Sequence, residues 1–248
     1  MNPNQENPQS GAFPLLLAAR NGHAGAVQAL LQAGVDPNQI APQSGAFPLL
    51  LAARNGRADA VQALLRAGAS PGQENPQSGV FALLLAAQNG HADVVKALLH
   101  AGADPGQVNP RDGNFPLLMA AQAGHADAVQ TLLQAGANPN QVKGQSGNFP
   151  LLLAARNGHA EAIRALLRAG AIPNVVKLNN GNFPLLLAVQ NGHVEAVQAL
   201  LQAGANPNLV NRLDRNFPLL LAVQNGHLDL VRALLRAGAD PNHARLQC

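Results

Sequence analysis

The chain has 248 residues, of which 47% are hydrophobic and 12% are charged, and its formal net charge is +3. This composition provides enough apolar side chains for a large core and argues against a disordered chain. A net charge of +3 over this length is too small to indicate nucleic-acid binding by itself.

The segment before the first phenylalanine lacks the basic stretch and apolar run of a secretory signal, so we expect none. The longest apolar stretch, Val80 to Ala87, is far shorter than the ~20 residues that cross a bilayer, so no membrane partner is expected. Cys248 is the one cysteine, and no disulfide can form within the chain. We therefore expect the cytoplasm or another reducing intracellular compartment.

A repeat of 34 residues organises the chain, because the seven phenylalanines follow one another at this spacing. Such a period is typical of repeat architectures. No linker or change in composition interrupts it, so we predict a single domain over residues 1–248. The predicted repeats are approximately 13–46, 47–80, 81–114, 115–148, 149–182, 183–216 and 217–248.

Each repeat is predicted to contain two helices, and residues 149–182 illustrate the pattern. Pro150 begins the first helix, because a nitrogen in the first turn needs no hydrogen-bond partner. Gly158 ends it by adopting a left-handed conformation. The second helix opens at His159, carries an apolar stripe and is closed by Gly170. The rest of the repeat is rich in Pro, Asn and Gly, which predicts a turn or short hairpin.

Neither helix is long enough to be stable alone in water, so each repeat must bury its apolar side chains against its neighbours. The residues FPLLLAARNGH at 13–23 and ALLQAGVDPN at 29–38 resemble the ankyrin repeat consensus, roughly TPLHLAA-x-x-GH and LL-x-x-GAD-x-N. Tetratricopeptide repeats share the period but lack the Gly-His junction and the long loop. The resemblance implies an all-α, ankyrin-type solenoid of stacked helix-turn-helix repeats with loop or short hairpin tips.

Three departures from the family pattern have consequences. Phe and Leu replace the family's Thr and His; the lost cap costs ~1 kcal/mol per helix, and burial of Phe, ~1.5–3 kcal/mol, offsets it. Each repeat has one residue more than the usual ankyrin repeat, and the extra residue falls in the loop. Neither terminal repeat carries the polar face of a capping repeat, so we expect either further flanking segments or association of the ends.

No pattern of residues predicts catalysis, a cofactor or a metal site. Histidines recur in one column, but helices stacked 8–10 Å apart cannot place two of them on one zinc ion. We expect these rings to bond around the start of the second helix. The acidic column at that position is expected to support the helix, with three pairs at i, i+3: Asp93–Lys96, Glu161–Arg164 and Asp229–Arg232. The chain is therefore predicted not to be an enzyme.

The resemblance implies a protein-binding module that uses the loop tips and the exposed side of the first helices. This surface is rich in amides and lacks Trp and Tyr, which leaves arginine as the main candidate for a strong contact. The predicted partner-binding residues are Arg20, Asn21, Arg54, Asn55, Gln88, Asn89, Arg111, Asp112, Asn114, Gln122, Asn148, Arg156, Asn157, Asn182, Gln190, Asn191, Asn216, Gln224 and Asn225.

Two alternatives stay open. The chain could be a structural, self-associating or engineered scaffold, since its first two loops are nearly identical and its ends lack polar caps. It could instead bind an acidic partner or, less favoured, nucleic acid through basic residues of the later loops. Arrays similar to this one occur in signalling proteins and in effectors that bacteria deliver into host cells, and the residues do not separate these cases. The basic loop residues are Arg111, Lys143, Lys177, Arg212, Arg215 and Arg245.

Overall fold

The computed structural model describes residues 12–144 and 146–242, and within these ranges the chain forms fourteen α-helices and no β-strand. The all-α prediction is confirmed. The helices are α1 (Pro14–Asn21), α2 (Ala24–Gln32), α3 (Pro48–Arg54), α4 (Ala58–Arg66), α5 (Ala82–Gln88), α6 (Ala92–His100), α7 (Pro116–Ala123), α8 (Ala126–Gln134), α9 (Pro150–Asn157), α10 (Ala160–Arg168), α11 (Pro184–Gln190), α12 (Val194–Gln202), α13 (Pro218–Gln224) and α14 (Leu228–Arg236).

The chain divides into two compact units, Met1–Ala120 with Gln134–Ala137 and Ala121–Leu133 with Asn138–Cys248. The boundary falls within the fourth helix pair, α7 and α8. That all seven repeats form one domain stays a prediction.

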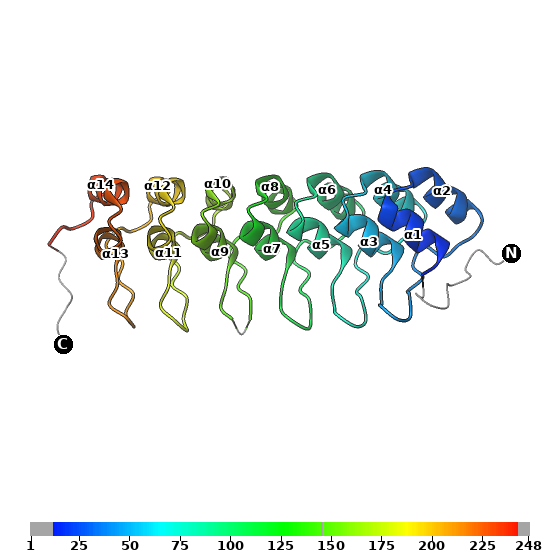
Figure 1. Cartoon of the computed structure of the whole chain (residues 1–248), viewed down its shortest axis with the longest axis horizontal. Coiled ribbons are helices and arrows are strands. Elements are labelled where there is room, and N and C mark those ends of the chain that lie inside the picture. Colours follow the sequence, from blue (N-terminus) through cyan, green and yellow to red (C-terminus); the bar gives the residue numbers. More distant parts are fainter. Residues whose placement is uncertain (1–11, 145, 243–248) are drawn as a thin grey trace. The chain divides into compact units, whose positions relative to one another are not determined.

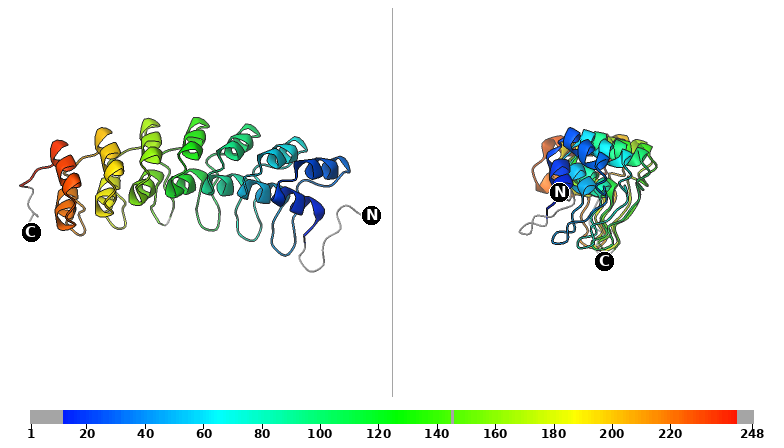
Figure 2. Two further views of the ribbon diagram at one scale, coloured as in Figure 1. Left: turned by 45° about the horizontal axis from the view of Figure 1, so that its top comes forward. Right: turned by 90° about the vertical axis from the view of Figure 1, so that its right-hand side faces the viewer.

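Each unit has two layers of helices. In the first unit α1, α3 and α5 lie side by side, and α2, α4 and α6 form the second layer (Figure 1). In the second unit α9, α11 and α13 form one layer, and α10, α12 and α14 form the other. Within each unit the loops project beyond the first helices, away from the second layer, as a further view also shows (Figure 2). This arrangement leaves the first helices and the loops on one common surface.

The phenylalanines anchor the repeats. All seven rings are buried, with at most 7% of the residue exposed. Phe149 precedes the first turn of α9 in an extended conformation, with φ −139° and ψ 159°, and its side chain cannot cap the helix by a hydrogen bond. Pro150 occupies the first turn, as predicted. The apolar contact of the ring therefore stands where a capping hydroxyl would otherwise hold the helix.

Glycine is required where the first helix ends. Gly158 has φ 78°, and its N–H donates to the carbonyl oxygens of Ala154 and Ala155. A Cβ at this position would lie 2.6 Å from Nδ1 of His193 in the next repeat. Both the left-handed backbone and the close approach of the imidazole exclude a larger residue.

The loop tips are short hairpin-like turns. Isolated antiparallel bridges pair Glu74 with Phe81 and Lys143 with Asn148. In the second of these loops, the N–H of Lys143 donates to the Asn148 carbonyl at 2.7 Å. The predicted turn or short hairpin is confirmed for these loops. Among the described residues, no helix is both long and apolar enough to span a bilayer.

Candidate partner-binding surface

The last turn of the first helices carries a column of exposed polar residues. In the part of the chain that the structure describes, the side chains of Arg54, Gln122, Arg156 and Gln190 are exposed and make no hydrogen bond within the chain. Arg20 and Gln224 are exposed at the same position of α1 and α13. Gln88 shares the position on α5 and is also exposed. Within each unit, these long side chains can reach a partner lying across the first helices.

The asparagines that follow this column form hydrogen bonds to the preceding repeat. The Nδ2 of Asn89 donates to the Arg54 carbonyl at 3.0 Å, and that of Asn157 donates to the Gln122 carbonyl at 2.8 Å. Asn55, Asn191 and Asn225 bind the preceding repeat in the same way. These amides tie adjacent first helices together, so part of the hydrogen-bonding capacity of these side chains is used within the chain. The assignment of Asn55, Asn89, Asn157, Asn191 and Asn225 to partner contacts stays a prediction.

The histidine column also connects neighbouring repeats. The Nε2 atoms of His91, His159 and His193 lie 3.0–3.1 Å from the carbonyl oxygens of Arg54, Gln122 and Arg156. A carbonyl only accepts, so each ring donates from Nε2. The rings bind the end of the preceding first helix, which corrects the expectation that they bond around the start of their own second helix. Within the described residues, no group of three or more His, Cys, Asp or Glu could hold a metal ion.

A second set of asparagines closes the turns after the second helices. The Nδ2 of Asn38 donates to the Gly68 carbonyl at 3.1 Å, and its Oδ1 accepts from the N–H of Ser70 at 2.8 Å. Asn140 and Asn208 make the same two contacts with the turns that follow them. The asparagine that ends the Asp-Pro-Asn turn at 36–38 therefore binds the turn of the next repeat.

A third set, in the loops, was not identified from the sequence. Asn75 is 6% exposed, and Asn109 and Asn211 are each 1% exposed. The Nδ2 of Asn109 donates to the Ser78 carbonyl of the preceding loop, and its Oδ1 accepts from the N–H of Arg111. Their position in the sequence could have identified them, because Asn75 and Asn109 each stand four residues before a loop glycine.

Several predicted loop residues also bind within the chain. A guanidinium N–H of Arg111 donates to the Pro76 carbonyl at 2.7 Å. Asp112 accepts from both the backbone and the side-chain N–H of Asn114. These bonds hold the basic side chain of Arg111 against the neighbouring loop. The remaining predicted residues Asn21 and Asn216 lie at the surface, exposed and partly exposed respectively, and Arg245 and Cys248 lie outside the described residues.

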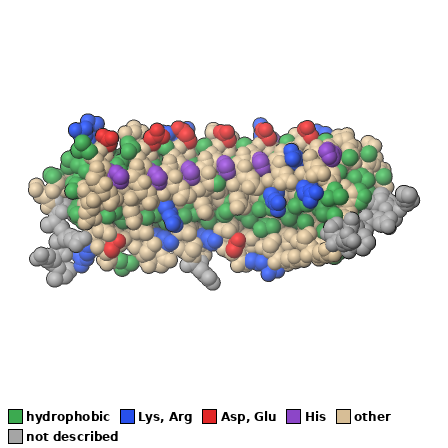
Figure 3. All heavy atoms as spheres, viewed as in Figure 1, with side chains coloured by type: hydrophobic (Ala, Val, Ile, Leu, Met, Phe, Trp, Pro, Cys, Tyr) green, Lys and Arg blue, Asp and Glu red, His purple; other side chains and the backbone are tan. Residues whose placement is uncertain are grey.

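The acidic column lies over the second helices, on the side away from the loops (Figure 3). Of the three predicted pairs, Glu161 and Arg164 form an ion pair of 2.5 Å in α10. Among the described residues, Asp93–Lys96 and Asp229–Arg232 make no such contact, which corrects the prediction. An exposed ion pair contributes little free energy, so the spacing of the residues alone does not determine that the pair forms.

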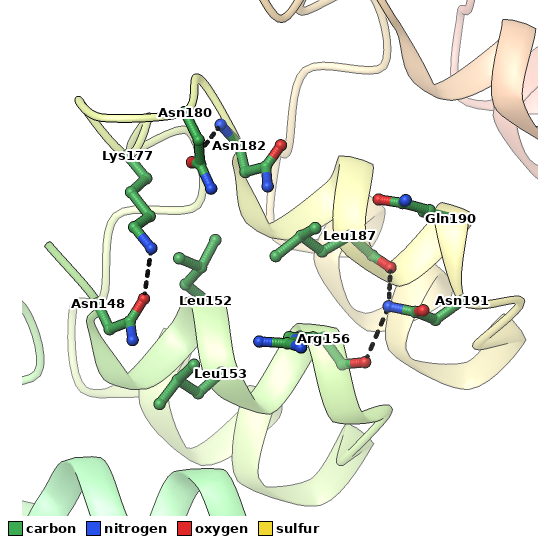
Figure 4. Close-up of a pocket in the computed structure, with 10 residues that line it drawn as sticks. All are labelled: Asn148, Leu152, Leu153, Arg156, Lys177, Asn180, Asn182, Leu187, Gln190 and Asn191. Atoms are coloured by element: carbon green, nitrogen blue, oxygen red, sulfur yellow. Dashed lines mark hydrogen bonds between the residues drawn. The ribbon is translucent and has the colours of Figure 1, made fainter. Parts of the chain in front are cut away.

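A cavity of about 330 Å³ lies between the loops and the first helices α9 and α11 of the second unit. The side chains of Leu152, Leu153 and Leu187 form its apolar part (Figure 4). Arg156 lies on one side of it, and Lys177, whose Nζ donates to Asn148 Oδ1 at 2.8 Å, lies on the other. The remaining lining residues are Asn180, Asn182, Gln190 and Asn191. Five predicted site residues from three successive repeats, Asn148, Arg156, Asn182, Gln190 and Asn191, thus line one cavity.

Comparison with known proteins identifies the family to which this architecture belongs. No curated protein matches the sequence. The crystal structure of the human ASB11 ankyrin repeat domain is similar, with a TM-score of 0.78 and 26% sequence identity over 93% of this chain and 100% of that one. The model of ankyrin repeats in three copies matches residues 1–75, 83–177, 117–211 and 151–245. The chain belongs to the ankyrin repeat family.

Proposed function

We propose that this chain is a non-catalytic module that binds a protein partner across its first helices and loop tips. Ankyrin repeats are generally protein-binding modules. On the surface that the first helices share with the loops, four side chains make no hydrogen bond within the described chain: Arg54, Gln122, Arg156 and Gln190. The observation that supports the proposal best is that the neighbouring asparagines and histidines are engaged between repeats, whereas this column is not.

The structural role of the asparagines narrows the proposed surface. Their hydrogen bonds hold successive repeats in register, which fixes the spacing of the arginine and glutamine side chains within each unit. A preorganised surface loses little side-chain and backbone freedom on binding. Arginine offers several donors in a rigid fork and is frequent among residues that dominate binding energy. We therefore place the strongest contacts at Arg54 and Arg156.

A quantitative pull-down with matched variants tests the proposal. The surface variant carries Arg54→Gln and Arg156→Gln, because other repeats have Gln88, Gln122 and Gln190 at the same position. The control carries Arg66→Gln and Arg168→Gln in the last turns of α4 and α10, where other repeats also have glutamine. Both variants lose two positive charges and keep helix-forming residues.

The expected result is a defined set of proteins that bind the wild-type chain and the control variant but not the surface variant. Purified candidates must then show the same order of affinity by calorimetry. Proteins that are lost equally from both variants would indicate general charge attraction and contradict the proposed surface.

We infer end-to-end self-association as a second candidate. Val223 is 60% exposed and Leu228 is 57% exposed, whereas Val189, at the position of Val223 one repeat earlier, is fully buried. Helices α13 and α14 thus expose two apolar side chains, and the position of Val223 is one that the preceding repeat buries. Within each unit every repeat packs against the one before it, so we propose that the first repeat of a second copy receives this face in the same way.

Light scattering over a range of protein concentrations tests this second candidate. We expect a concentration-dependent increase in mass for the wild-type chain, and its loss in the double variant Val223→Lys, Leu228→Glu. The control variant Ile172→Lys, Leu178→Glu changes exposed apolar residues away from that face and should associate as the wild-type chain does. A monomeric wild-type chain at high concentration would rule out this candidate.

A further inference from the structure

One column of the loops differs between repeats in a way that changes the surface. Residues at this position are Ala41, Asn75, Asn109, Lys143, Lys177 and Asn211. Where asparagine is present, its side chain is buried and binds the preceding loop. At Lys177 the ammonium group instead donates to Asn148 Oδ1, on the last residue before the Phe149 anchor.

The exchange of asparagine for lysine leaves space against the preceding loop. A Cβ at Gly45 would lie 2.6 Å from Asn75 Oδ1, and one at Gly79 would lie 2.5 Å from Asn109 Oδ1. The nearest atom to a Cβ at Gly147 is the Lys177 Cγ, at 3.6 Å. The pairs of loops that asparagine joins are therefore packed more tightly than the pair between Gly147 and Lys177. The cavity described above lies at this more open pair of loops.

The charges around this cavity are unbalanced. Arg156 and Lys177 both line it, and the close-up shows their charged groups on opposite sides of Leu152 (Figure 4). No Asp or Glu is among its described lining residues, and the Arg156 guanidinium has no hydrogen-bond partner within the described chain. The amides of Asn182 and Gln190 add neutral donors. Two cations and several N–H groups around one small cavity are complementary to a carboxylate.

The pairing of two cations is specific to this place. The residues that correspond to Arg156 and Lys177 in the other described repeats are Arg20 with Ala41, Arg54 with Asn75, Gln88 with Asn109, Gln122 with Lys143, and Gln190 with Asn211. None of these pairs combines arginine with lysine. A ligand that needs both cations would therefore be held at one register along the repeats.

We propose that this cavity receives the carboxylate of a glutamate or aspartate side chain from an extended partner peptide. The inference rests on the proposed function and adds the chemistry of one partner residue. Arg156 binds the carboxylate through its guanidinium, Lys177 provides the second charge, and aliphatic neighbours in the peptide contact Leu152 and Leu187. A peptide fits better than nucleic acid, because the cavity offers leucines and no exposed aromatic ring on which a base could stack.

The test uses the full chain and a pair of acetylated, amidated peptides, Ala-Leu-Glu-Leu-Ala and Ala-Leu-Gln-Leu-Ala. Nuclear magnetic resonance titration follows the side-chain amide signals of Asn148, Asn182 and Gln190. We expect saturable shifts with the glutamate peptide and none with the glutamine peptide. Arg156→Gln and Lys177→Asn should each weaken binding about tenfold, because a charge-assisted hydrogen bond is lost.

The variants carry residues that other repeats already have, so both should fold. Arg168→Gln is the matched control: it removes the same charge from α10, where Arg168 is exposed and does not line the cavity, and it should leave the affinity unchanged. Equal weakening by Arg168→Gln would overturn the proposal. The proposal would also be overturned if inorganic phosphate bound as tightly as the glutamate peptide. The same holds if an oligothymidylate bound more tightly and displaced the peptide.

The same variants separate this inference from the proposed function. If partners depend on the double variant Arg54→Gln, Arg156→Gln but the glutamate peptide does not bind, the protein-binding surface stands and the carboxylate site is refuted. If the peptide binds and depends on Arg156 while no protein depends on this surface, the cavity stands and the module's proposed function fails.

Discussion

The substitution Asn109→Ala tests whether the loop asparagines hold the repeats together. Asn109 is 1% exposed, its Nδ2 donates to the Ser78 carbonyl at 3.2 Å, and its Oδ1 accepts from the Arg111 N–H at 2.9 Å. Alanine removes both bonds. Each is worth about 1 kcal/mol net, and the two stranded backbone groups add a desolvation cost that nearby water partly relieves. We expect the free energy of unfolding to fall by about 2–3 kcal/mol.

Urea unfolding followed by far-ultraviolet circular dichroism measures this change, because the chain has no Trp or Tyr for fluorescence. The control is Asn89→Ala, which removes one exposed hydrogen bond to the Arg54 carbonyl at a position where another repeat has Ala123. That variant should lose about 0.5–1 kcal/mol. If Asn109→Ala costs no more than Asn89→Ala, burial does not strengthen the loop contact and the reasoning is refuted.

Three further predictions follow from the same contacts. Lys177→Asn should raise the free energy of unfolding by about 1 kcal/mol, because asparagine can form the buried loop contact that other repeats have; a lower urea midpoint would contradict this. Phe183→Ala should lower it by about 3–5 kcal/mol, since the ring is 1% exposed, and a loss below about 1 kcal/mol would show that the ring is not an anchor. Gly158→Ala should cost more than Gly170→Ala, because a Cβ meets the His193 ring only at the first position. Equal melting temperatures for these two variants would show that the imidazole moves aside.

The pattern of residues predicted the repeat and its helices, because these depend on local conformation and on the obligation to bury apolar side chains. The spacing of the phenylalanines placed the anchors, and all seven rings are buried. Pro150 and Gly158 marked the beginning and end of α9, since their allowed backbone angles decide where a helix starts and stops. The resemblance to ankyrin repeats, rather than local conformation, suggested the column that includes Arg156, and the structure shows this residue exposed.

The tertiary structure decided which polar groups remain available. Asn89 and Asn157 have the composition of a binding surface, but each donates to a carbonyl 35 residues earlier in the chain. Only the packed register of two repeats brings these atoms together. Likewise, Arg156 and Lys177 lie on different elements, and they share a cavity only in the folded chain, where Lys177 stands in place of the asparagine that joins other loops. Local periodicity determines which helices form, whereas contacts between repeats determine which side chains are left for a partner.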